Sequence, residues 1–134
     1  MGDWTGGCMC GKVRFRLESE PFDAGWCHCR TCQLTSGAPA VVFASVREGD
    51  YIFTAGEEAV GRARSSGLGH RAFCSECGTP LYMKDDDQPK TVDFSSATLD
   101  EPGRLRPGFH IFWSSRLPWM AAADDLPKFD RTRS

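Results

Sequence analysis

The chain has 134 residues, a length typical of one domain that can bury a modest core. Its formal net charge is -2 and its isoelectric point is about 5.9, so it lacks the basic surplus typical of nucleic-acid-binding proteins. No apolar stretch approaches the roughly twenty residues that span a bilayer. We therefore expect one domain over residues 1–134, located in the cytoplasm, with neither a nucleic-acid partner nor a membrane partner.

Fourteen glycines and eight prolines separate short apolar runs, which predicts many strands and turns rather than long helices. Val13, Phe15 and Leu17 alternate with basic residues, the pattern of a strand with one buried face. The run 40–44 predicts a strand that is buried on both faces. Further short strands are expected at 51–53, 71–73, 81–83, 91–94 and 110–112. Residues 124–134 offer little to pack and are expected to form a loosely held tail.

The seven cysteines are the most informative feature of the chain. They form three tight groups, Cys8-x-Cys10, Cys27-x-Cys29-x-x-Cys32 and Cys74-x-x-Cys77. A disulfide framework is disfavoured because the number is odd, because the first residues lack a secretory signal, and because a C-x-C spacing suits a bridge poorly. The groups are instead typical of thiolate metal sites, and we expect two zinc ions.

Two of the groups make one complete set of four ligands. Cys74-Ser75-Glu76-Cys77-Gly78 has the outline of a zinc knuckle, in which Gly78 can adopt a positive φ. Cys8 and Cys10 are the natural second pair, because residues two apart in an extended segment point to the same side. The sequence therefore predicts a structural zinc held by Cys8, Cys10, Cys74 and Cys77.

The remaining group, Cys27, Cys29 and Cys32, supplies three thiolates to a second ion. A fourth position would then stay free for water or substrate, and a substrate thiol bound there would be deprotonated. One alternative is a second structural site that a histidine completes, with His28, His70 and His110 as the candidates. A redox role for Cys29-x-x-Cys32 is disfavoured because the chain shows no βαβ pattern.

Four ordered blocks resemble the glutathione-dependent formaldehyde-activating enzymes, a family that also includes centromere protein V. The blocks are Gly7-Cys8-x-Cys10-Gly11, Cys27-His28-Cys29-x-x-Cys32-Gln33, Phe73-Cys74-x-x-Cys77-Gly78-Thr79 and His110-Ile111-Phe112 with Ser115-Arg116 and Pro118-Trp119. The resemblance implies a mostly β fold of several coiled antiparallel sheets, stabilised by a four-cysteine structural zinc. It also implies a catalytic zinc held by Cys27, Cys29 and Cys32.

The same resemblance implies an activity. The family reaction joins glutathione to formaldehyde and forms S-hydroxymethylglutathione, so the resemblance implies a carbon–sulfur lyase with a small-molecule thiol as substrate. His110 and Trp119 are expected beside the site on the resemblance alone. Arg30, Arg71 and Arg116 are candidate partners for the carboxylates of a thiol such as glutathione.

Two rival functions differ in class from this one. A zinc-stabilised binding module without chemistry would have the same cysteines but no open metal position. A methionine-sulfoxide reductase would need a nucleophilic cysteine near its C-terminus, and no cysteine follows Cys77. The sequence leaves the oligomeric state, the physiological thiol and the aldehyde open.

Overall fold

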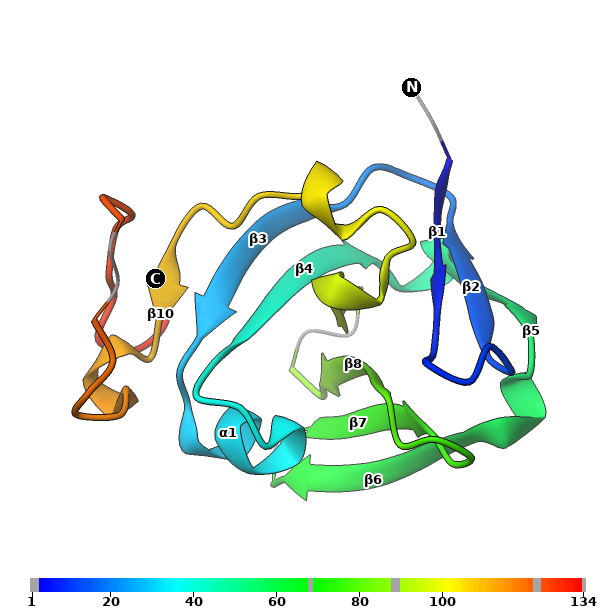
Figure 1. Cartoon of the computed structure of the whole chain (residues 1–134), viewed down its shortest axis with the longest axis horizontal. Helices are drawn as coiled ribbons and strands as arrows, with labels where there is room; N and C mark the ends of the chain where they lie inside the picture. Colours follow the sequence, from blue (N-terminus) through cyan, green and yellow to red (C-terminus); the bar gives the residue numbers. More distant parts are fainter. Residues whose placement is uncertain (1–2, 68, 88–89, 122–123, 134) are drawn as a thin grey trace.

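A computed structural model describes residues 3–67, 69–87, 90–121 and 124–133, which form two sheets, one short α-helix and five 3-10 helices (Figure 1). The smaller sheet has the strand order β1–β2–β5, with β1 (Trp4–Gly7), β2 (Arg14–Leu17) and β5 (Tyr51–Ala55). The larger sheet has the order β10–β3–β4–β9–β8–β7–β6. Its strands are β3 (Phe22–Cys27), β4 (Val41–Arg47), β6 (Val60–Ser66), β7 (Gly69–Cys74), β8 (Pro80–Asp85), β9 (Thr91–Ser95) and β10 (His110–Ile111). The expected mostly β architecture is confirmed.

The helix and the one parallel pairing lie close together. Helix α1 (Arg30–Ser36) follows β3 directly, and β10 pairs with β3 in parallel, with His110 opposite Trp26 and Ile111 opposite Cys27. Every other pairing between these strands is antiparallel, as expected. The exception arises because a long connection from β9 lets the chain enter β10 in the direction of β3. None of the helices in the described part of the chain has the length and apolar character needed to cross a membrane.

The alternating pattern at the start of the chain is confirmed, whereas the prediction for residues 40–44 is only half right. Val13, Phe15 and Leu17 are buried, and Arg16 of β2 is exposed. In β4, Ala44 is fully buried, but Val41 and Phe43 are only half-buried. The expectation of burial on both faces fails there because these two side chains line a cavity.

The apolar side chains form two clusters. The larger lies between the sheets and is built from Phe15, Leu17, Ala24, Ala44, Val46, Tyr51, Val92, Phe94 and Leu99. The smaller contains Val13, Ala59 and Leu81 together with two cysteine side chains, Cys8 and Cys74. Two of the four cysteines predicted to hold the structural zinc therefore lie in the apolar interior.

The segment expected to be a loose tail is held along β10. The amide of Phe129 donates to the carbonyl of His110 at 2.8 Å, and the amide of His110 donates to the carbonyl of Pro127 at 2.8 Å. The amide of Phe112 donates to the carbonyl of Arg131 at 2.7 Å. Backbone pairing of this kind needs few apolar side chains, so composition gave no sign of it. Ser134 lies outside the described residues.

Candidate metal centres and the adjoining cavity

The side chains of Cys8, Cys10, Cys74 and Cys77 converge on one point. Their sulfur atoms all lie within 4.8 Å of one another, with 3.5 Å from Cys8 to Cys10 and 3.9 Å from Cys10 to Cys74. A tetrahedral zinc with bonds of about 2.3 Å to sulfur holds its ligands about 3.8 Å apart. None of the seven cysteines is in a disulfide. The four sulfurs are therefore placed as a closed tetrahedral set that could hold a metal ion.

Two similar loops present these sulfurs. Each ends in a glycine with φ of 82°, Gly11 after the first pair and Gly78 after the second, and such a φ suits glycine because it has no Cβ. The Thr79 hydroxyl joins the loops, because it accepts from the amide of Met9 at 3.1 Å and lies 3.2 Å from the sulfur of Cys77. That hydroxyl, together with nearby backbone amides, lowers the pKa of the Cys77 thiol to about 5. The second loop thus favours the thiolate form that metals bind.

The sulfurs of Cys27, Cys29 and Cys32 form the second set, again within 4.8 Å of one another. Cys27 ends β3, Cys29 caps the N-terminus of α1, and Cys32 lies in the first turn of that helix. The Cys29 sulfur accepts from the amide of Cys32 at 3.2 Å, and the Cys27 and Cys32 sulfurs are 3.3 Å apart. Hydrogen bonds from Cys27 and Cys32 lower the pKa of the Cys29 thiol to about 2. Cys27 and Cys32 are buried while Cys29 is half-buried, so the set is accessible from the Cys29 side.

The three histidines do not complete this second set. Among the described residues, no fourth ligand atom of a histidine, cysteine, aspartate or glutamate lies within the same mutual distance. His28 bonds to His110, with 2.9 Å from Nε2 of His28 to Nδ1 of His110. His70 lies edge-on to the ring of Tyr82. The geometry therefore favours three protein sulfurs and one open position over the histidine-completed alternative.

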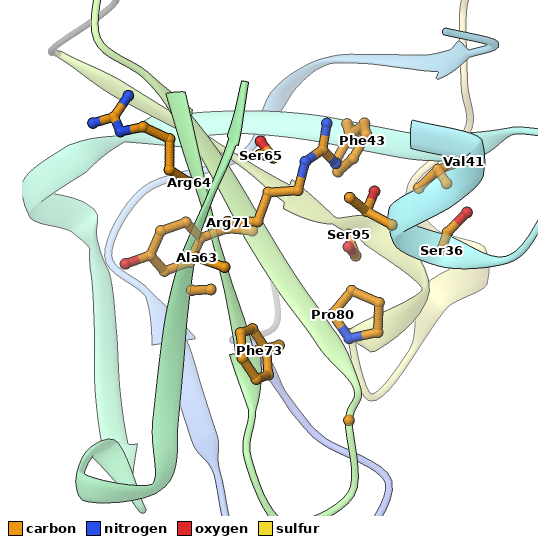
Figure 2. A pocket seen from close by; sticks show the side chains of 14 residues that line it. Ser36, Val41, Phe43, Ala63, Arg64, Ser65, Arg71, Phe73, Pro80 and Ser95 are labelled. Carbon is orange, nitrogen blue, oxygen red and sulfur yellow. The ribbon is translucent and has the colours of Figure 1, made fainter. Parts of the chain in front are cut away.

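A cavity of about 380 Å³ is lined in part by Arg71, a residue that also contacts Cys32 of the second set (Figure 2). Its walls are largely apolar, and Thr35 and Ser36, which follow Cys32 in α1, also line it. The apolar wall residues include Val41, Phe43, Ala63, Phe73 and Pro80. Arg64 and Arg71 also line the cavity, and Arg64 is paired with Asp86. Arg71 is thus the one of the three arginines named from the sequence that lies in the cavity wall.

Arg71 connects the cavity with the second set. Its Nη2 group donates to the sulfur of Cys32 at 3.5 Å, and its guanidinium carbon lies 5.8 Å from the centre of the Phe43 ring. Figure 2 shows the side chain extending from its strand toward Phe43. The buried Nε group of Arg71 has no hydrogen-bond partner among the described residues. A donor left unpaired in this way suits an anionic ligand.

The other candidates from the sequence lie elsewhere. Arg30 bonds to the side chain of Gln33, and Arg116 stacks over the ring of Trp113. Trp119 is 68% exposed and does not line the cavity. His110 does approach the second set, through His28. No sequence pattern pointed to Asp124, which bonds to His110 from a segment 14 residues further along the chain.

Three comparisons relate this chain to known proteins. The family model described as "Glutathione-dependent formaldehyde-activating enzyme" matches residues 3–115. A Halomonas elongata protein named "Putative glutathione-dependent formaldehyde-activating enzyme" is 30% identical over 122 residues, which covers 86% of this chain and 78% of the relative. An uncharacterised lyase of Schizosaccharomyces pombe is 30% identical over 83 residues, covering 62% of this chain and 58% of that protein.

A solved structure supports the fold. The crystal structure of a Rhodobacter sphaeroides protein superimposes with a TM-score of 0.60, covers 93% of this chain and 98% of its own chain, and shares 19% sequence identity. At that identity the likeness concerns the arrangement of the strands alone.

Proposed function

Because the chain belongs to the glutathione-dependent formaldehyde-activating enzyme family, we propose that it is a zinc-dependent carbon–sulfur lyase acting on a thiol–aldehyde adduct. Glutathione and formaldehyde, which form S-hydroxymethylglutathione, are the family precedent for the substrates. The observation that supports this most is the second set of three sulfurs, which has an accessible side and adjoins a cavity with a cationic wall.

The donor chemistry fits two zinc ions with different roles. Four thiolates from Cys8, Cys10, Cys74 and Cys77 complete a coordination shell, which is typical of a structural ion. A zinc ion on Cys27, Cys29 and Cys32 would supply an open position at which a thiol binds as the thiolate. Soft sulfur donors select zinc over magnesium or calcium, whose ligands are oxygen atoms.

The proposed reaction needs no reagent besides the thiol and the aldehyde. The thiolate sulfur attacks the carbonyl carbon of the aldehyde, a sulfur–carbon bond forms, and the π electron pair of the carbonyl moves to its oxygen. That oxygen takes up a proton equivalent to the one that the thiol released, which gives the hydroxymethyl thioether. In the lyase direction the same bond breaks. The chain's own contribution is to hold the thiol carrier so that sulfur and carbon meet.

The cavity is sized for the thiol and not for the aldehyde. Pockets for small ligands span about 300–1,000 Å³, and formaldehyde would fill only a small part of such a space. The 380 Å³ cavity can therefore enclose much of a tripeptide-sized thiol. Arg71 stands between the cavity and Cys32, where it can pair with a carboxylate of the thiol while the sulfur faces the open side of the second set.

The proposal is tested by metal analysis together with turnover. We expect two zinc ions per chain in protein prepared without chelator. Exchange NMR with ¹³C-labelled formaldehyde and glutathione should show interconversion of free aldehyde and adduct faster than in buffer alone. One ion per chain would overturn the proposal, and two ions without acceleration would favour the non-catalytic zinc-stabilised binding module.

A substitution at Arg71 tests the role of the cavity. Arg71→Met should raise the KM for glutathione by about 10–100-fold, because a hydrogen bond to a charged group contributes about 1.5–3 kcal/mol. The KM for 2-mercaptoethanol, which has no carboxylate, should change little. Arg71→Lys is the matched control that keeps the charge and should retain part of the affinity. An equal loss with both thiols would show that Arg71 acts on the metal centre through Cys32 and not on the substrate.

A further inference from the structure

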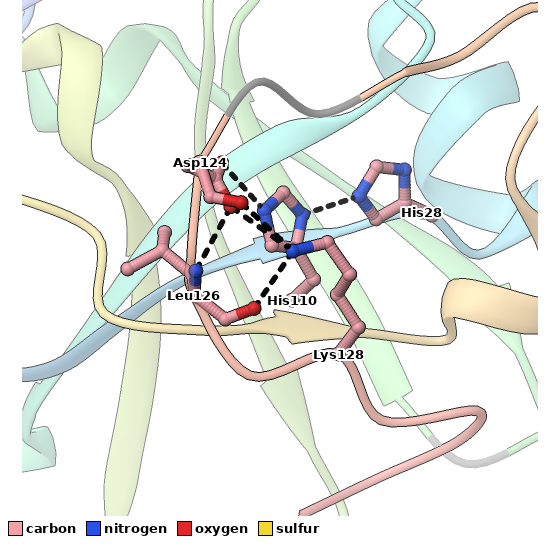
Figure 3. A network of polar contacts seen from close by, with 5 residues as sticks. All are labelled: His28, His110, Asp124, Leu126 and Lys128. Atoms are coloured by element: carbon pink, nitrogen blue, oxygen red, sulfur yellow. Dashed lines mark hydrogen bonds and ion pairs between the residues drawn. The ribbon is translucent and has the colours of Figure 1, made fainter.

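A chain of three polar side chains leads from the surface to His28, which stands between Cys27 and Cys29 in the sequence (Figure 3). His28 lies between two of the cysteines, is 1% exposed, and contacts His110 with 2.9 Å between Nε2 of His28 and Nδ1 of His110. His110 is 3% exposed, and its Nε2 lies 3.0 Å from Oδ2 of Asp124. Asp124 in turn lies 3.1 Å from Nζ of Lys128. We call the first three residues the His28–His110–Asp124 chain.

The rest of His28 is held just as closely. Its amide donates to the carbonyl of Ile111 at 3.2 Å, and its carbonyl accepts from Nε2 of Gln33 at 3.0 Å. The ring of Trp113 packs edge-on against the His28 ring, with 5.0 Å between ring centres. The backbone that carries Cys27 and Cys29 is therefore anchored to β10 and α1 through the residue between them.

The hydrogen bonds favour one arrangement of protons on the two rings. The hydrogen bond from His110 lowers the pKa of Asp124 to about 2, so Asp124 is ionised and can only accept. In the arrangement that these contacts favour, Nε2 of His110 donates to Asp124 and Nδ1 of His110 accepts from Nε2 of His28. His28 then has no proton on Nδ1, a buried atom that has no partner among the described residues.

We propose that Asp124 is a positioning residue for the second metal site, acting through His110 on the loop of Cys27, His28 and Cys29. The ionised carboxylate fixes the tautomer and orientation of His110, which fixes His28 and so the spacing of the two cysteine sulfurs that flank it. Residues that orient metal ligands in this way change metal affinity by about 10–100-fold when they are replaced. The family model matches residues 3–115, and Asp124 lies outside that range. The contact between Asp124 and His110 is therefore not part of the family match.

The tautomers can be measured directly. Long-range ¹H–¹⁵N NMR of the zinc-loaded protein should show His28 with its proton on Nε2 and His110 with its proton on Nε2. In Asp124→Asn, which keeps the shape but removes the charge, the His110 signals should move toward a mixture of tautomers. A proton on Nδ1 of His28, or unchanged signals in the variant, would overturn the proposal.

The rate of zinc release is the second measurement, and the four-cysteine site of the same molecule is its internal reference. The proposal rests on the proposed zinc at Cys27, Cys29 and Cys32, and the four-cysteine site serves as the reference. In a chelator challenge, Asp124→Asn should release one of two zinc ions about tenfold faster or more and the other at the wild-type rate. Lys128→Met removes the neighbour of Asp124 but leaves the bond to His110 in place, so it should behave like wild type.

The outcomes separate the two proposals. Wild-type protein that holds a single ion would contradict the proposed function itself. Two ions in both proteins with equal release rates would contradict only the role of Asp124. Faster release of both ions, with a lower melting temperature, would show a general loss of stability and would also overturn the positioning role. Glu18→Gln, which removes an exposed ion pair with Arg16, controls for the loss of one surface carboxylate.

Discussion

Cys77→Ser should unfold the protein. Zinc bound by a set of thiolates contributes about 10–16 kcal/mol of apparent binding free energy, whereas the net stability of a domain is about 5–15 kcal/mol. Cys77 is half-buried and packs against the smaller apolar cluster, whereas Cys8 and Cys74 are buried within it. Because serine is close to cysteine in size, the replacement removes a proposed metal ligand with little direct effect on packing. The measurement is the dispersion of amide signals in a ¹H–¹⁵N NMR spectrum, which should collapse in the variant.

The control for this experiment lies in the same loop. Glu76 is exposed, so Glu76→Gln changes the charge beside Cys77 without touching a ligand and should retain a dispersed spectrum. Added zinc should not restore wild-type stability to Cys77→Ser, because three sulfurs hold the ion less strongly than four. A Cys77→Ser variant that stays folded with wild-type stability would show that the fold does not depend on a metal ion at the four-cysteine set.

Cys29→Ser should abolish turnover while the fold is retained. Serine is among the preferred N-cap residues, and its hydroxyl can accept from the amide of residue 32 as the Cys29 sulfur does, so α1 should begin as before. The second set, however, loses one of its three sulfurs. Replacing residues that merely orient a ligand already lowers activity by about 10–100-fold, so we expect a loss of at least about a hundredfold here.

The measurements for Cys29→Ser are the exchange rate between formaldehyde and its glutathione adduct, the zinc content, and the thermal unfolding curve. We expect one zinc ion per chain and a melting temperature close to that of wild type. Thr31→Ser, a change within the same short segment, is the control and should remain active. Loss of folding in parallel with activity would indicate that the second ion is structural. Unchanged turnover would place the chemistry elsewhere.

The cysteine sets could be predicted from the sequence because ligand spacing is a local property. Two pairs and a trio already suggest how the sulfurs divide between two ions, and the structure brings the same residues together. The alternation of Val13, Phe15 and Leu17 likewise predicted a strand with one buried face. By contrast, β3 contains Gly25 and lacks alternation, and β6 is rich in polar residues, so neither gave a strand pattern.

The contacts around the second set could not be predicted because they depend on which distant segments meet. No local sequence pattern predicts that β10 pairs with β3 or that the two strands run parallel. The cavity is lined by residues of α1, β4, β6, β7, β8 and β9, so it forms only when these elements have packed together. Asp124 meets His110 only once residues 127–131 have paired with β10 and the residues that follow it, through backbone groups that are the same in every sequence.

The connection from Asp124 to His28 also bears on the order in which the two proposed metal sites would form during synthesis. A ribosome makes the chain from its N-terminus, and domains commonly begin to fold in that order. All seven cysteines have been made once Cys77 is complete, whereas His110 and Asp124 follow much later. Both proposed metal sites would therefore have all their cysteines before the loop around His28 is braced. The proposed second site would then reach its final geometry only after Asp124 has been made.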